Sequence, residues 1–152
     1  MLGNTYEDQN CSAARALELV GERWSLLIVR DALFGGTTRF ADFQRSLGVA
    51  RNILSTRLDR FVEAGLMERR QAEGSPYHEY HLTEKGEDLK PVVIALSHWG
   101  DRWAAPSGPP ILYRHAGCGS RVEQQLVCGD CGQTLTNEQV GAHRGPGLTV
   151  AG

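Results

Sequence analysis

The sequence has no long hydrophobic run. None of its apolar stretches approaches the roughly 20 residues that a transmembrane helix needs. The first residues, from Met1 to Asp8, also lack the basic-then-apolar order of a secretory signal peptide. We therefore expect a cytoplasmic protein that has no membrane partner.

Cysteine and net positive charge are also scarce. The chain has four cysteines and a formal net charge of −2. In a reducing compartment, so few cysteines suit metal binding or thiol chemistry better than a disulfide framework. The net charge excludes a uniformly basic nucleic-acid-binding domain. A local basic face is still compatible with it, because residues 39–60 contain five arginines and only two aspartates.

Apolar residues at helical spacing predict a succession of short helices in the first 65 residues. The expected ranges are 11–20, with Ser12 as the N-terminal cap, then 24–33, 39–47 and 50–64. Glycines follow all four ranges, as is typical of helix C-termini. The last two helices are separated only by the Gly48-Val49 junction, which indicates a helix-turn-helix.

A hairpin is predicted directly after these helices. Residues 66–70 and 77–82 have strand character and flank a Gly74-Ser75-Pro76 turn. A helix-turn-helix followed by a hairpin is the winged-helix arrangement. Thr83 is expected to cap a long apolar helix that reaches Trp103 and is kinked by Pro91.

The predicted fold class is therefore mainly α, with α+β character. Residues 1–105 form a winged helix-turn-helix with a long C-terminal dimerisation helix, and residues 106–110 form a linker. Residues 111–136 form a small β-rich unit resembling a zinc ribbon, and residues 137–152 form a flexible tail.

The helix predicted over residues 50–64 is the candidate recognition helix. Arginine side chains can pair with guanine and asparagine side chains with adenine in the major groove. Polar positions on this helix, the arginine that begins the preceding helix and the hairpin supply the predicted DNA-binding residues: Arg39, Arg51, Asn52, Ser55, Thr56, Arg57, Arg69 and His78. The alternatives are a solvated helix face and a hairpin that only adds solubility.

Several motifs resemble those of the HxlR family, which is related to the MarR-type regulators. They occupy residues 11–17, 21–31, 38–43, 54–58, 64–67 and 80–86. The resemblance covers about residues 11–103 and departs from the family at Ser12, where proline is common. It implies a dimeric winged-helix repressor or activator that binds a pseudo-palindromic operator in double-stranded DNA. It also implies that the first and last helices form the dimer contact.

Cys11 is the candidate regulatory thiol. At the start of a helix, free backbone N–H groups and the helix dipole favour a thiolate. The family resemblance implies that the matching cysteine can sense oxidants or electrophiles. The alternative is a small, half-buried packing residue. Trp24, Trp99 and Trp103 could line a pocket for a small-molecule effector, although packing in the core or at an interface is the competing interpretation.

The C-terminal region contains two similar Cys/His segments, residues 115–119 and 128–132. In each, two ligand types are separated by two residues and followed by glycine, a spacing that lets both side chains reach one ion. His115, Cys118, Cys128 and Cys131 are thus predicted to hold one structural zinc ion. A metal-free hairpin with free thiols is the alternative.

Two other functions compete with DNA binding. A winged helix can act as a protein-binding adaptor, because a fold does not determine function. Residues 128–131 could instead form a dithiol redox site. Redox motifs of this kind begin a helix, however, and no helical pattern follows Gly132. No catalytic residues are assigned, and we do not expect an enzyme.

Overall fold

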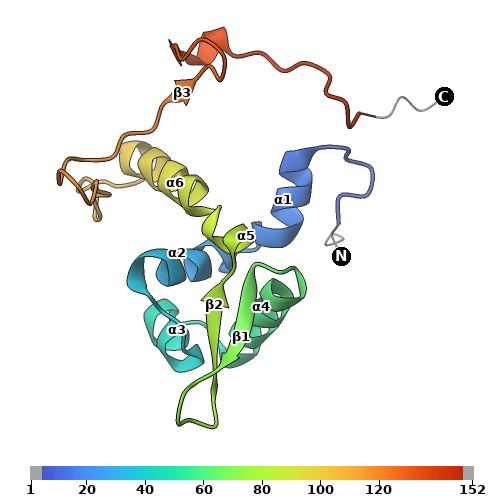
Figure 1. Cartoon of the computed structure of the whole chain (residues 1–152), viewed down its shortest axis with the longest axis vertical. Helices are drawn as coiled ribbons and strands as arrows, with labels where there is room; N and C mark the ends of the chain where they lie inside the picture. The colour runs from blue at the N-terminus through green and yellow to red at the C-terminus, as the bar shows by residue number, and fades with distance from the viewer. Residues whose placement is uncertain (1–4, 149–152) are drawn as a thin grey trace. The chain divides into compact units, whose positions relative to one another are not determined.

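The computed structural model describes residues 5–148 (Figure 1). The chain divides into two compact units, one extending to Val93 and the other beginning at Ile94. Each unit is described separately below. Within the described residues, none of the helices is both long enough and apolar enough to cross a membrane.

The first unit begins with the helices predicted from the sequence, which are α1 (Ser12–Val20), α2 (Ser25–Gly35), α3 (Phe40–Leu47) and α4 (Arg51–Glu63). Gly36 and Gly48 adopt the left-handed conformation that ends α2 and α3. The turn after Gly48 joins α3 to α4, which confirms the helix-turn-helix. The predicted cap of α1 is wrong by one residue, because Cys11 is the N-cap and Ser12 is already helical.

The wing is an antiparallel hairpin of β1 (Met67–Gln71) and β2 (His78–Leu82). The segment just before α3 extends the hairpin. The Tyr80 N–H donates to the Thr38 carbonyl over 2.8 Å, and the backbones of Arg39 and Glu79 form an isolated antiparallel β-bridge. Figure 1 shows the hairpin beside α3 and α4, with its tip extending past their ends. The backbone thus ties the wing to the start of α3.

One hydrophobic core holds these elements together. It contains Ile28 and Val29 from α2, Phe43 from α3, and Leu54, Leu58 and Phe61 from α4. Leu66 and Met67 at the start of the hairpin complete it. Because one face of α4 is buried in this cluster, the opposite face points into solvent.

The long helix predicted after Thr83 is two helices. Thr83 caps the short α5 (Glu84–Glu87) by accepting a hydrogen bond from the Gly86 N–H, and α6 (Lys90–Trp103) follows. Pro91 is the second residue of α6. In a first helical turn the missing N–H of proline costs no helical hydrogen bond. Pro91 therefore lies at the start of a helix, and the prediction that it kinks a continuous one is wrong.

The second unit contains most of α6, a loop region and two minimal strands. Tyr113 is buried, its hydroxyl lies 2.9 Å from the Ser97 hydroxyl, and its carbonyl accepts the Val122 N–H. Strands β3 (Leu126–Val127) and β4 (Thr134–Leu135) pair antiparallel within the range predicted to be a small β-rich unit. In the predicted tail, Asn137–Gln139 form a 3-10 helix, and residues 149–152 lie outside the described range.

A glycine at position 86 is required by the packing between α5 and the hairpin. A Cβ at Gly86 would lie 2.2 Å from the Leu66 carbonyl oxygen, a backbone atom that also accepts the Thr83 N–H. We expect Gly86→Ala to lower the free energy of unfolding by about 1–3 kcal/mol, as overpacking does. Chemical denaturation measures this. The control is Gly35→Ala, whose Cβ would meet only the Thr37 hydroxyl at 3.3 Å; an equal loss in both variants would contradict the explanation.

Candidate nucleic-acid interface

The outward face of α4 carries the residues predicted to read bases. Arg51, Asn52, Ser55 and Thr56 are all exposed. The Thr56 hydroxyl donates to the backbone carbonyl of Asn52 over 2.9 Å, one turn back along the helix. This group occupies the first turns of α4, the part of a recognition helix that enters the major groove in helix-turn-helix proteins.

The N-terminus of α4 suits an anion. Ala50 is the N-cap, and no side chain caps the helix there. Backbone N–H groups at such a terminus, together with the helix dipole, favour a bound phosphate. The guanidinium of Arg51 lies beside them, with its central carbon 5.3 Å from the centre of the Phe40 ring. The start of α4 thus combines a helix N-terminus without a side-chain cap and an exposed arginine.

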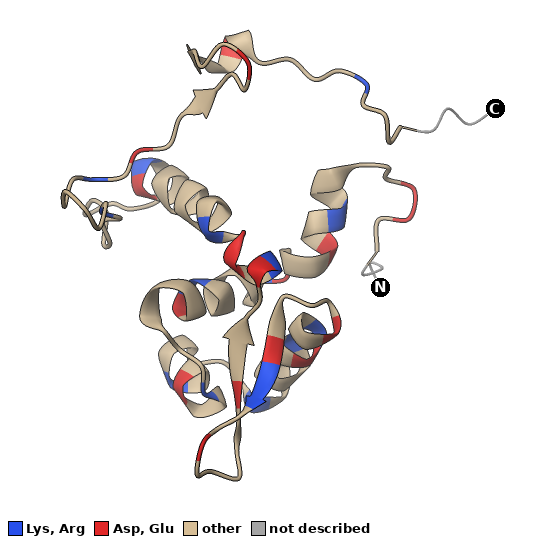
Figure 2. Ribbon diagram, viewed as in Figure 1, with Lys and Arg blue, Asp and Glu red and all other residues tan. Residues whose placement is uncertain are grey.

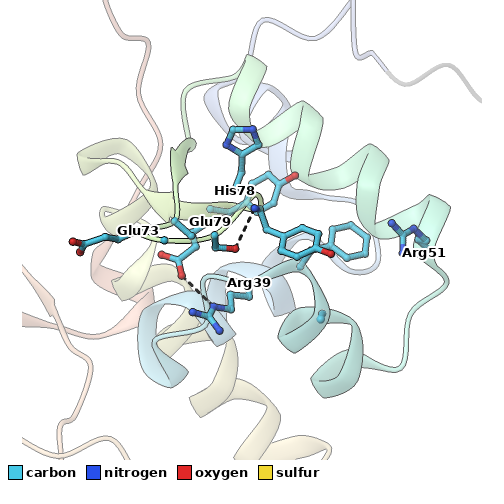
Figure 3. Close-up of a pocket in the computed structure, with 12 residues that line it drawn as sticks. Arg39, Arg51, Glu73, His78 and Glu79 are labelled. Atoms are coloured by element: carbon cyan, nitrogen blue, oxygen red, sulfur yellow. Dashed lines mark hydrogen bonds and ion pairs between the residues drawn. The ribbon is translucent and has the colours of Figure 1, made fainter.

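A hollow of about 720 Å³ separates this helix start from the wing (Figure 3). Arg39 and Phe40 line it from the start of α3, and Arg51 lines it from α4. His78 and the exposed Tyr77 line it from the hairpin. The predicted residues Arg39, Arg51 and His78 therefore share one concave surface.

Tyr77 is a wing residue that the sequence interpretation missed. Its side chain is 76% exposed, which is unusual for a tyrosine. The available signal was its position directly after the Gly74-Ser75-Pro76 turn, at the tip of the predicted hairpin. A tyrosine there can contact a sugar–phosphate backbone through both its ring and its hydroxyl.

Acidic residues neutralise part of the basic charge of this surface. Arg39 pairs with Glu79 at 3.2 Å, and this guanidinium, followed by His81, lowers the pKa of the Glu79 carboxyl. Arg69 pairs with Asp59 and lies over the Tyr80 ring. Figure 2 shows basic and acidic residues together on β1. Arginines of the wing are thus oriented by carboxylates before any ligand binds.

Arg57 lies apart from the other predicted DNA contacts. Its side chain is only 16% exposed, and its guanidinium pairs with Glu22 at 2.7 Å. Glu22 lies between α1 and α2, so this ion pair fixes α4 relative to the preceding helices. In this structure Arg57 is engaged by Glu22, and its predicted contact with DNA stays a prediction.

Cys11 is exposed at the N-terminus of α1, so the half-buried packing role does not describe it. The backbone N–H groups of Ala14 and Ala13 lower the pKa of the Cys11 thiol. Arg15 does not contribute to this shift. Its guanidinium instead binds Glu18 at 2.6 Å and the Tyr6 carbonyl at 3.1 Å.

The predicted zinc ligands form two pairs. The His115 Nδ1 atom lies 3.1 Å from the Cys118 Sγ atom, and Cys128 contacts Cys131 in the second segment. Across the described residues 5–148, no group of three or more potential ligands is close enough to hold one ion. The structure thus brings together each pair and leaves the two pairs separate.

The three tryptophans do not share one environment. Trp24 packs against the core of the first unit, as the packing interpretation predicted. Trp99 and Trp103 on α6 are more than 60% exposed. An effector pocket lined by them remains a prediction.

Comparison with known proteins identifies the family. The profile of the HxlR-like helix-turn-helix family matches residues 19–108. The HTH-type transcriptional regulator Rv3095 of Mycobacterium tuberculosis is 47% identical over 139 residues, covering 90% of this chain and 87% of that protein. The chain also resembles the crystal structure of PA1607, described as a candidate transcription factor, with 40% identity, a TM-score of 0.82, and coverage of 92% and 99% of the two chains.

Two further solved structures are of regulators named for their chemistry. The redox regulator HypR in its reduced form is 26% identical, with a TM-score of 0.55 over 60% of this chain and 92% of HypR. The reduced transcriptional regulator YodB of Bacillus subtilis is 29% identical, with a TM-score of 0.53 over 64% and 98% of the chains. The family profile covers both the helix-turn-helix and the wing of this chain. The chain therefore belongs to the HxlR-like helix-turn-helix family of transcriptional regulators.

Proposed function

We propose that the protein is a homodimeric regulator that binds a specific DNA operator through α4 and the wing, and whose DNA affinity responds to an oxidant or electrophile at Cys11. The exposed cluster of Arg51, Asn52 and Ser55 at the start of α4, beside the hollow under the wing, carries this proposal. These side chains belong to the types that read base edges, and their helix is held rigidly by its buried face.

Docking on DNA divides the work between two groups of residues. The start of α4 enters the major groove, where Arg51 and Asn52 contact bases. Arg39, Tyr77 and His78 around the hollow contact the adjacent sugar–phosphate backbone, which fixes register without reading sequence. The mixed charge of the surface supports this division, because a surface on which acidic residues offset the arginines gains little non-specific affinity for DNA.

The dimer is proposed to form through α6. Val92, Leu96, Trp99 and Trp103 follow one another at spacings of four, three and four residues, and each is 47–64% exposed. This spacing is that of the contact positions of a coiled coil, in which two helices cover each other's apolar stripe. A second copy of the chain has the same apolar stripe, so in a symmetric dimer each α6 covers the stripe of the other.

Cys11 is proposed as the point of chemical control. Its thiol is exposed, and its lowered pKa increases the fraction of reactive thiolate at neutral pH. Similar proteins have been solved in two chemical states, as with the reduced and oxidised forms of HypR and the quinone-bound and diamide-treated forms of YodB. If the first helices also meet in the dimer, as the family resemblance implies, oxidation of Cys11 to a disulfide with another thiol would shift them and alter the separation of the recognition helices.

The base contacts are tested by selecting bound DNA from a random pool and measuring affinities by fluorescence anisotropy. We expect Arg51→Ala and Asn52→Ala each to weaken binding to the selected site by about 1–3 kcal/mol and to change binding to random DNA much less. The selected site should hold two half-sites about 34 Å apart. The matched control is Arg45→Ala on α3, an exposed arginine paired with Asp42. Equal losses on specific and random DNA would refute base reading by α4.

The dimer is tested by analytical ultracentrifugation. We expect the wild-type chain to sediment as a dimer at micromolar concentration and Trp99→Glu to sediment as a monomer, because a buried unpaired carboxylate is costly at an interface. Asp101→Asn changes the same helix outside the stripe and should leave the dimer intact. A wild-type monomer, or a Trp99→Glu dimer, would contradict the interface.

The sensor is tested by the rate of alkylation at Cys11 as a function of pH. Since its pKa is lowered, Cys11 should react faster near pH 7 than an ordinary thiol, and its rate should fall only as the pH drops through that lowered pKa. Diamide should reduce operator binding of the wild type and leave Cys11→Ser unchanged. Ordinary labelling rates together with diamide-insensitive DNA binding would rule out Cys11 as the sensor.

A further inference from the structure

Two turns in the second unit have the same backbone structure. In the first, the His115 N–H donates to the Ser120 carbonyl and the Gly119 N–H donates to the His115 carbonyl, both over 2.8 Å. In the second, the Cys128 N–H donates to the Gln133 carbonyl over 2.9 Å and the Gly132 N–H donates to the Cys128 carbonyl over 3.0 Å. The two turns therefore match hydrogen bond for hydrogen bond.

The glycines of the two turns match as well. Gly119 and Gly132 both have φ of +73°, a left-handed conformation that side-chain-bearing residues rarely adopt. No other pair of turns in the described residues shares both this glycine angle and a Cys/His pair three residues apart. We refer to residues 115–120 as the first knuckle and residues 128–133 as the second knuckle.

Each knuckle brings two potential metal ligands together. In the first, His115 Nδ1 and Cys118 Sγ are 3.1 Å apart. Two ligands of a tetrahedral zinc ion, at bond lengths of 2.0–2.3 Å, lie about 3.5 Å from each other. The observed separation is within a few tenths of an ångström of that value, so the first knuckle needs little adjustment to bind.

The second unit also lacks an apolar core. Among residues 94–148, Tyr113 is the one buried residue, while Ile111, Leu112, Leu126 and Val127 are 44–56% exposed. Units of this size without a core depend on a metal, a disulfide or a partner for stability. All four cysteines of the chain are free, and three of them lie in the knuckles.

We propose that His115, Cys118, Cys128 and Cys131 form a closed, tetrahedral site for one zinc ion per chain, in which the ion joins the first knuckle to the second. Each knuckle alone provides two ligands, and a structural zinc site needs four. The ion supplies the attraction that draws the two knuckles together. The site has no open coordination position, so its role is structural.

A competing arrangement uses the second knuckle alone. Two copies of the chain could bind one ion through four cysteines, Cys128 and Cys131 from each. That arrangement would bind about half an ion per chain and would not involve His115, whereas the proposed site binds about one ion per chain and requires it. Stoichiometry and the His115 variants therefore separate the two.

The experiment is elemental analysis of the full-length, tag-free protein after loading with Zn²⁺ and desalting, repeated with Co²⁺ so that absorption reports geometry. We expect about one ion per chain, tetrahedral cobalt bands, and a sulfur-to-cobalt charge-transfer band with the intensity of three thiolates. His115→Ala should lose at least about tenfold in metal affinity. The matched control is His143→Ala, an exposed histidine of the same unit outside both knuckles.

A conservative exchange guards against loss of metal through misfolding. His115→Cys should retain about one ion per chain and raise the charge-transfer intensity from three thiolates to four, because thiolate replaces imidazole as a zinc ligand. Half an ion per chain, insensitivity to His115→Ala, or an unchanged charge-transfer band in His115→Cys would each overturn the proposal.

Discussion

Burial of one face of α4 is the constraint on which the functional surface depends. Leu54, Leu58 and Phe61 are each at most 1% exposed and pack with residues of α2, α3 and β1. Truncating a buried leucine or phenylalanine of this kind to alanine usually costs about 2–5 kcal/mol. The same contacts leave α4 a single orientation, so the direction in which Arg51 and Asn52 point is set by the core and not by the polar residues themselves.

The wing is positioned by hydrogen bonds at the middle and at the C-terminal end of β2. Near its middle, β2 pairs with Thr38 just before α3, and at its end the Thr83 N–H and hydroxyl bind the carbonyls of Leu66 and Gly65. These bonds hold the hairpin and the helix-turn-helix as one body. The Arg57–Glu22 ion pair adds a link from α4 to the segment between α1 and α2. A rigid pairing of helix and wing is what a protein needs to read bases and contact phosphates in one register.

The second unit follows different physical rules. Its elements are short, its apolar side chains are exposed, and its regular features are the two knuckles. Where apolar burial is too small to offset the loss of chain entropy, the folded form depends on an added attraction. The proposed zinc ion between the knuckles and the proposed partner chain against α6 would each supply such an attraction.

The sequence determined the order and type of most elements. Apolar spacing located α1 to α4 within a few residues, the turn residues located the hairpin, and glycine after each helix marked where it ends. These features could be predicted because they depend on local chain properties such as periodicity, capping and turn preference. The four knuckle residues were found in the same way, since ligand spacing and a following glycine are visible in the chain itself.

Tertiary structure decided which of these residues can act together. Arg57 and Arg51 look equivalent in the sequence, yet Arg57 is paired with Glu22 and Arg51 faces the hollow under the wing. The division of the predicted helix between Glu87 and Lys90 and the exposure of Tyr77 likewise depend on what packs nearby. Local sequence does not contain this information, because a side chain's partner is set by residues that are distant along the chain and adjacent only after the core has formed.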